Sequence, residues 1–109
     1  MNIDKETQEK IQELQNYEQT LQSIMMQKQA FSMELSETEN ALEEITKSID
    51  DVYKLVGNIM IKADKSNIEK ELKQKNDLLK LRLKSIEKQE TDISKEAEEL
   101  REEVMKKIK

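Results

Sequence analysis

Along most of the chain apolar residues recur at alternating steps of three and four, the spacing of one buried stripe on a long helix. Before Gly57 no Gly or Pro interrupts this repeat. It predicts a helix over about residues 4–48, roughly 65 Å long at 1.5 Å per residue. The stripe combines two heptad series: Leu14, Leu21, Lys28, Leu35, Leu42 and Ile49, and Ile3, Lys10, Tyr17, Ile24, Phe31, Thr38, Ile45 and Val52.

A second stripe of the same kind occupies the C-terminal part and predicts a helix over about residues 67–108. The run Ser66-Asn67-Ile68-Glu69 predicts its start. The Ser66 hydroxyl can accept a hydrogen bond from the Glu69 amide, and the Glu69 side chain can reach back to the Ser66 amide. The two series are Leu72, Leu79, Ile86, Ile93, Leu100 and Lys107, and Asn76, Leu83, Glu90, Ala97 and Val104.

Between the stripes the pattern becomes that of β-structure. β-Branched and aromatic residues flank Gly57-Asn58, a two-residue loop with Gly first, as a type II′ hairpin turn requires. One helix running straight through is the alternative, but Gly and Asn together would weaken it at its middle. The predicted hairpin residues are Val52, Tyr53, Leu55, Val56, Gly57, Ile59, Met60 and Ile61.

Pairing Val56 with Ile59 across the turn also aligns the two helices. It sets Leu14 beside Leu100, Leu21 beside Ile93, Leu35 beside Leu79, and Leu42 beside Leu72. The predicted fold class is therefore mainly α: a long antiparallel two-helix coiled coil with a β-hairpin between the helices. We expect a single domain over residues 1–109, with coiled-coil helices at 1–48 and 66–109 and the hairpin element at 49–65.

The predicted hairpin is apolar on both faces. Val52, Val56, Ile59, Ile61 and Ala63 share one face, and Tyr53, Leu55 and Met60 share the other. A two-stranded hairpin is marginally stable in water, and it leaves two strand edges unpaired. The pattern predicts no further strands in this chain, so we expect hairpins from several subunits to assemble into an intersubunit β-barrel or sheet.

Several polar residues occupy core-type positions, where they usually fix register at some cost in stability. They are Lys28, Thr38, Asn76 and Glu90. We expect Lys28 to lie near Glu87 or Glu90 across the coil. Three methionines, Met25, Met26 and Met33, are interpreted as adaptable filler or coil surface rather than as a site.

Composition narrows the possible functions. The chain has 109 residues, 19 basic and 24 acidic, with no His, no Cys and a single Gly. It therefore lacks an imidazole base, a thiolate nucleophile, the usual zinc ligands and a phosphate-cradling loop. We expect no enzyme, no cofactor and no metal site.

Charge and hydropathy exclude further classes. A net charge of -5, with acids and bases interspersed, argues against binding nucleic acid. The basic run Lys106-Lys107-Ile108-Lys109 is interpreted as a solvated helix end that complements the helix dipole. There is no apolar stretch of about 18 residues and no signal-peptide core, so we expect no membrane partner and a cytoplasmic location.

Apolar residues also concentrate where both predicted helices end, at the tip of the coil away from the hairpin. Fraying there would expose flexible apolar side chains surrounded by charge. The pattern does not separate a binding tip from an ordinary frayed coil end. The tip residues are Ile3, Ile11, Leu14, Leu100, Val104, Met105 and Ile108.

The hairpin sequence carries a family resemblance. Val52-Tyr53-Lys54-Leu55-Val56-Gly57-Asn58-Ile59-Met60-Ile61 resembles the hairpin signature of the beta-type prefoldin subunits, in which an apolar residue, Tyr or Phe, Lys, two apolar residues and Gly precede a second apolar strand. The flanks are similar too, from the Gln-rich Ile11-Gln12-Glu13-Leu14-Gln15 to Leu79-Lys80-Leu81-Arg82-Leu83. The high Lys and low Arg content leans toward an archaeal member.

This resemblance implies a subunit of a hexamer with two alpha-type and four beta-type chains. Its hairpins would form a double β-barrel body, and its six coiled coils would hold unfolded polypeptides at their tips without ATP, for delivery to a group II chaperonin. The function that the resemblance implies is thus that of a holdase chaperone subunit. The alternative is a structural coiled-coil spacer or filament subunit whose tip binds nothing.

Overall fold

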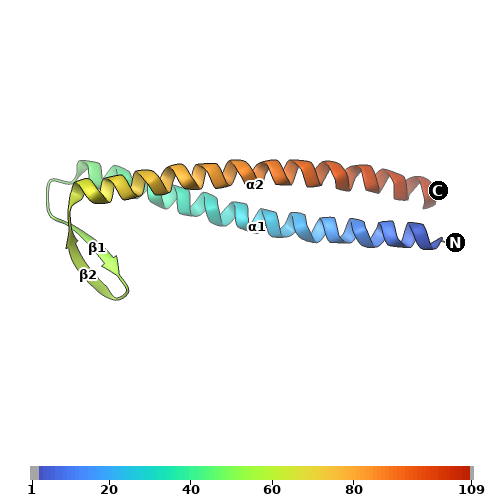
Figure 1. Ribbon diagram of the computed structural model, residues 1–109, viewed down its shortest axis with the longest axis horizontal. Coiled ribbons are helices and arrows are strands. Elements are labelled where there is room, and N and C mark those ends of the chain that lie inside the picture. Colours follow the sequence, from blue (N-terminus) through green and yellow to red (C-terminus); the bar gives the residue numbers. More distant parts are fainter. Residues whose placement is uncertain (1–2, 109) are drawn as a thin grey trace. The chain divides into compact units, whose positions relative to one another are not determined.

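The computed structural model describes residues 3–108 and contains two helices and two strands. Their order is α1 (Lys5–Lys47), β1 (Val52–Val56), β2 (Ile59–Ala63) and α2 (Lys65–Ile108) (Figure 1). The helices begin and end within two residues of the spans 4–48 and 67–108 that the repeats predict. The two long helices with a β-hairpin between them are therefore confirmed.

The chain divides into two compact units. The first joins the α1 residues up to Gln29 to the α2 residues from Lys84 onward, and the second comprises Ala30–Leu83, including the hairpin. Within the first unit Lys10 Nζ lies 3.3 Å from Glu103 Oε2. Within the second, Lys75 Nζ lies 3.2 Å from Glu34 Oε1. In each unit the two helix segments run antiparallel, as predicted.

The buried apolar side chains occupy the predicted heptad stripes. In the second unit Leu79 is 1% exposed and Ile45 is 7% exposed. Burying a side chain of this size contributes about 1.5–3 kcal/mol, so the helices are held by their shared stripe. The buried apolar residues of the first unit are Ile24, Ile86, Ala97, Leu100 and Val104.

Polar residues interrupt these stripes where they were predicted. Lys28 Nζ lies 3.1 Å from Glu90 Oε1, which confirms the expected pairing across the coil. Thr38 is buried, and its hydroxyl donates to the Glu34 carbonyl oxygen within its own helix. Asn76 Oδ1 is buried and accepts no hydrogen bond from the described residues. Polar residues at such positions favour one register of the two helices, because in a shifted register their polar groups would face other partners.

The methionines of the coil lie on its surface. Met25 is 54% exposed, Met26 is 67% exposed and Met33 is 66% exposed. Of the two roles predicted for them, coil surface is therefore the correct one.

The start of α2 differs from the prediction. The helix begins at Lys65, and Asp64 caps it: the Asp64 carbonyl accepts from the Ile68 amide at 3.0 Å, and Oδ1 accepts from the Ser66 amide at 3.4 Å. The predicted Ser66 cap is wrong because Ser66 already lies inside the first turn. A carboxylate at the cap also complements the positive end of the helix dipole.

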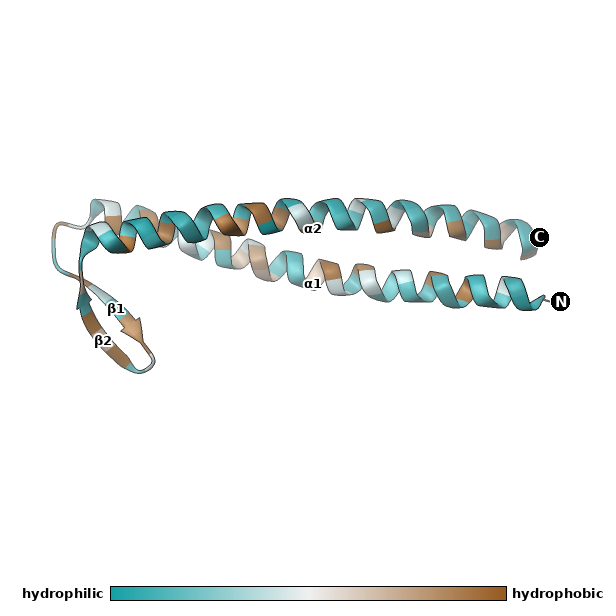
Figure 2. Ribbon diagram, in the orientation of Figure 1, coloured by the Kyte–Doolittle hydropathy of each residue, from teal (hydrophilic) through white to brown (hydrophobic). Residues whose placement is uncertain are grey.

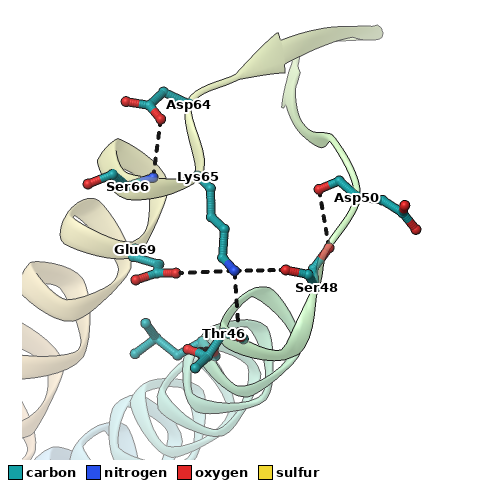
Figure 3. A network of polar contacts seen from close by, with 8 residues as sticks. Thr46, Ser48, Asp50, Asp64, Lys65, Ser66 and Glu69 are labelled. Atoms are coloured by element: carbon teal, nitrogen blue, oxygen red, sulfur yellow. Dashed lines mark hydrogen bonds and ion pairs between the residues drawn. The ribbon is translucent and has the colours of Figure 1, made fainter.

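Lys65 links the two helix ends that flank the hairpin (Figure 3). Its Nζ donates to the carbonyl oxygen of Ser48 at 2.7 Å and to that of Thr46 at 3.5 Å. It also lies 4.0 Å from Glu69 Oε1. The last carbonyl groups of a helix lack partners within the helix, so this ammonium satisfies groups that would otherwise need water.

The C-terminal end of α2 carries basic residues, which complement the helix dipole. Lys106 and Lys107 lie in the last turn of α2, as predicted for a helix end, while Lys109 lies outside the described residues. Between residues 3 and 108 neither helix is long and apolar enough to cross a membrane.

Candidate functional site

The hairpin turn has the geometry that its two residues predict. Gly57 has a φ of 61°, whereas Asn58 has no positive φ, which is the type II′ combination. A Cβ atom at Gly57 would meet nothing within 4 Å, so the backbone angle alone requires glycine there. The register pairs Val56 with Ile59 and Val52 with Ala63, as predicted.

Both faces of this hairpin are open to solvent. On one face Leu55 is 68% exposed and Met60 is 67% exposed. On the other face Ile59 is 66% exposed. Tyr53, Val56 and Ile61 are each at least half exposed. The strands contain many of the most hydrophobic residues coloured in Figure 2. The hairpin therefore exposes to solvent side chains of the kind that proteins usually bury in a core.

The strand edges are open as well. Among the described residues β1 and β2 pair only with each other. Ion pairs fix the hairpin to its surroundings at two points: Lys54 Nζ lies 3.2 Å from Glu71 Oε2, and Lys62 Nζ lies 3.4 Å from Asp51 Oδ2. An edge strand with unpaired N–H and C=O groups is a template for another strand.

A shallow groove of about 560 Å³ runs between the hairpin and the helix ends of the second unit. Tyr53 and Leu55 line it from β1, and Ile45 and Leu72 line it from the helices. The groove joins exposed strand residues to the buried stripe, so a strand or side chain entering it would extend the core of this unit.

The predicted tip lies in the first unit, where the ends of the helices are tied together. The Thr7 amide donates to Asp4 Oδ1 at 2.7 Å, an N-cap that the sequence analysis did not identify. Hydrogen bonds from the Thr7 side chain and backbone lower the pKa of Asp4 below its usual value. Hydrogen bonding to Glu103 and the charge of that carboxylate raise the pKa of Lys10.

The apolar tip residues differ in exposure and fall into three groups. Leu100 and Val104 belong to the buried stripe, at 9% and 5% exposure. Ile3 and Met105 are exposed, at 37% and 48%. The remaining three, Ile11, Leu14 and Ile108, are half-buried. With the helix ends packed together, the tip exposes only a small apolar surface. Most of the apolar surface of the tip residues is buried between the helices.

Acidic side chains surround part of this buried stripe. Tyr17 and Leu100 line a groove of about 190 Å³ together with four glutamates, Glu13, Glu96, Glu99 and Glu103. Desolvation, followed by the charge of Glu96, raises the pKa of the Tyr17 phenol. This acidic rim was not predicted from the sequence, although the spacing of the glutamates along both helices was the available signal.

The structure thus combines two long helices with an open, apolar β-hairpin between them. Comparison with known proteins gives the family. A sequence model described as prefoldin subunit matches residues 8–109. The crystal structure of the prefoldin beta subunit from Thermococcus strain KS-1 is 34% identical, with a TM-score of 0.86 over 96% of this chain and 94% of that chain.

Individual relatives agree. A prefoldin subunit beta of Saccharolobus islandicus is 46% identical over 48 residues, which cover 44% of this chain and 38% of the relative. One of Sulfolobus acidocaldarius is 43% identical over 47 residues, covering 43% of this chain and 38% of the relative. These matches thus span well under half the length of the curated relatives. The chain belongs to the prefoldin subunit family and is a beta-type member of it.

Proposed function

We propose that the chain is a subunit of an ATP-independent holdase chaperone. Copies of it assemble with alpha-type prefoldin subunits, four beta-type with two alpha-type chains, through an intersubunit β-barrel. The coil tips hold unfolded polypeptides, and a group II chaperonin in the cytoplasm receives them. The chain contributes binding surfaces and no catalytic groups.

The observation that carries the assembly is the open hairpin. Six of its apolar residues, distributed over both faces, are at least half exposed, and both strand edges lack partners among the described residues. Apolar burial contributes about 25 cal/mol per Å², so joining such hairpins is strongly favourable. Other subunits with the same strands supply the missing core and the missing hydrogen bonds together.

The tip supports client binding through its adaptable apolar groups. Ile3 and Met105 are exposed, and Leu100 and Val104 become available when the helix ends separate. Unfolded proteins present apolar segments without a fixed shape, so flexible side chains on several coils suit them better than a rigid pocket. Several weak tips acting together bind by multivalency and still release the client.

The buried state of Leu100 and Val104 favours the second candidate, a structural spacer. A spacer needs a closed coil end and gains nothing from exposed apolar groups. Both candidates require the same hairpin assembly, so only the tip distinguishes them.

Deletion of the residues before Leu14 and after Leu100 tests the proposal. We expect the mass of the assembly to fall only by the deleted residues, while suppression of the aggregation of a denatured client is largely lost. Undiminished protection would contradict client binding at the tip. It would favour client binding at the coil surface around Met25, Met26 and Met33 instead.

A full-length variant with Ile3→Ser and Met105→Ser complements the deletion, because it retains both helix ends. Met26→Ser is the matched control, since Met26 is exposed on the same unit but outside the tip. We expect reduced protection from the tip variant and unchanged protection from the control. Equal protection from both, with the deletion inactive, would assign the client contacts to the buried stripe residues.

A further inference from the structure

The hairpin is joined to the two helices by connections of unequal length. A single residue, Asp64, separates β2 from α2, whereas residues 48–51 separate α1 from β1. The short connection fixes the point at which the hairpin is attached to α2. It does not fix the direction of the strands, because the backbone dihedral angles on either side of the connection can rotate.

Packing against the helices leaves this direction open as well. The groove of about 560 Å³ separates part of the hairpin from the helix ends of the second unit. Tyr53 and Leu55 line the groove and are still 52% and 68% exposed. Close packing across the groove would bury these side chains, so apolar contacts do not hold the hairpin at one angle.

One ion pair connects a strand to a helix. Lys54 Nζ lies 3.2 Å from Glu71 Oε2, and the ammonium donates a hydrogen bond to this carboxylate. Lys54 is the middle residue of β1, and Glu71 lies six residues, about 9 Å, into α2. Between residues 3 and 108 no other ion pair or side-chain hydrogen bond joins a strand to a helix.

Lys54 interrupts an otherwise apolar face of the hairpin. Alternation along β1 places it on the face of Val52 and Val56, and the register pairs it with Ile61. The Lys54 and Glu71 side chains are 49% and 56% exposed, and a pair this exposed contributes little to stability. Once neighbouring hairpins cover the face, an ammonium without a carboxylate partner becomes costly to bury.

We propose that Glu71 is a positioning residue for assembly, which holds Lys54 and thereby sets the angle between the hairpin and α2. This role rests on the proposed assembly through the strands. The ion pair contributes little while water surrounds it and more once neighbouring hairpins exclude the water. Assembly therefore favours the hairpin angle at which the Glu71 carboxylate reaches Lys54.

Removing the carboxylate charge tests the role. Glu71→Gln keeps the size of the side chain, and Asp77→Asn is the matched control, because Asp77 is exposed on α2 and makes no ion pair with another described residue. With alpha-type prefoldin subunits present, the full-length Glu71→Gln chain should dissociate on dilution at a concentration at least about tenfold higher than wild type. The control should match wild type, and equal behaviour of the two variants would overturn the inference.

The dissociated chain separates positioning from general stabilisation. Because the exposed pair contributes little there, Glu71→Gln should leave the melting temperature of the dissociated chain unchanged. A melting temperature that falls in proportion to the loss of assembly would make Glu71 a stabilising residue of the single chain and would overturn the positioning role.

Exchanging the two charges tests whether the residues act as a pair. Lys54→Glu and Glu71→Lys each place two like charges together, so each variant alone should assemble more weakly than wild type. The double variant restores an ion pair of reversed direction and should assemble more tightly than either single variant. A double variant that assembles no better than Lys54→Glu alone would overturn the inference.

The angle itself can be measured, because the chain has no native Cys to compete with spin labels. Labels at Asn58→Cys, in the hairpin turn, and at Lys80→Cys, on the exposed surface of α2, report the distance between them. Labelled chains are diluted with unlabelled ones in the assembly, so that each distance lies within one chain. We expect a narrow distance distribution that Glu71→Gln broadens, whereas an unchanged distribution would contradict the positioning role.

The strand assembly and the positioning role fail in different ways. A wild-type chain that stays monomeric with alpha-type subunits present would overturn both. A wild-type chain that assembles, while Glu71→Gln dissociates at the same concentration as Asp77→Asn, would overturn the positioning role alone.

Discussion

The ammonium of Lys65 donates to the carbonyl oxygen of Ser48 over 2.7 Å. A side chain from the first turn of α2 therefore satisfies a carbonyl group at the C-terminal end of α1. The hairpin leaves the helices between these two residues. One side chain thereby ties together the two chain segments on which the assembly element stands.

Replacing Lys65 with Met should lower the free energy of unfolding by about 1 kcal/mol, because the helix C-terminus loses a charged donor. Thermal unfolding measures this loss. The matched control is Lys47→Met: Lys47 also carries a charge in the last turn of α1, but among the described residues its ion pair is with Glu43 of the same helix. The control should change stability by less than about 0.5 kcal/mol, and equal losses would show that the junction adds nothing.

Gly57→Ala should destabilise the hairpin by about 1–2 kcal/mol, because an L side chain is strained at a φ of 61°. Since no atom lies within 4 Å of the added Cβ, the loss comes from the backbone alone. Gly57→Asn should lose less, as Asn tolerates positive φ. Assembly midpoints on dilution measure both, and an Ala variant as stable as wild type would contradict the turn geometry.

Leu55→Asp with Ile61→Asp places one charge on each exposed face of the hairpin. We expect strong helical circular dichroism to remain while the mass of the assembly collapses toward that of a single chain. Sedimentation or light scattering gives the mass. Native mass in this variant would rule out assembly through the strands.

Lys28→Met tests whether a charge in the stripe serves register rather than stability. The Lys28 and Glu90 side chains are 38% and 29% exposed, and a pair of this kind contributes roughly 0–1 kcal/mol. Methionine buries more apolar surface there, so the melting temperature should stay the same or rise. A large loss of stability would refute the register role.

Asp4 should make the start of α1 sensitive to acid. Its pKa is lowered in the folded chain by the hydrogen bonds from Thr7, so the carboxylate stabilises the folded state above the unfolded pKa of about 3.8. That contribution is lost as the pH falls through the lower, folded pKa. Amide exchange at Thr7 measures it, and Asp4→Asn, which can cap at any pH, should remove the acid dependence.

Local sequence determined most of the architecture. The three-four spacing specifies a helix stripe wherever it persists, and the Gly57-Asn58 turn sets the strand register, because both depend on neighbours in the chain. That register predicted that Lys28 lies near Glu87 or Glu90, and the structure shows Glu90 as the partner at 3.1 Å. The sequence also predicted the apolar faces of the hairpin, since alternation along a strand requires no knowledge of distant residues.

Only the tertiary structure decided the details that depend on distances between segments. Asp64 and Ser66 are both good caps, and Asp64 was selected because its carbonyl accepts the first helical hydrogen bond directly after β2. The partner of Lys65 could not be read from the chain, since a long flexible ammonium reaches many groups. The burial of Leu100 and Val104 likewise depends on how closely two remote helix ends approach, and spacing along one helix does not determine that approach.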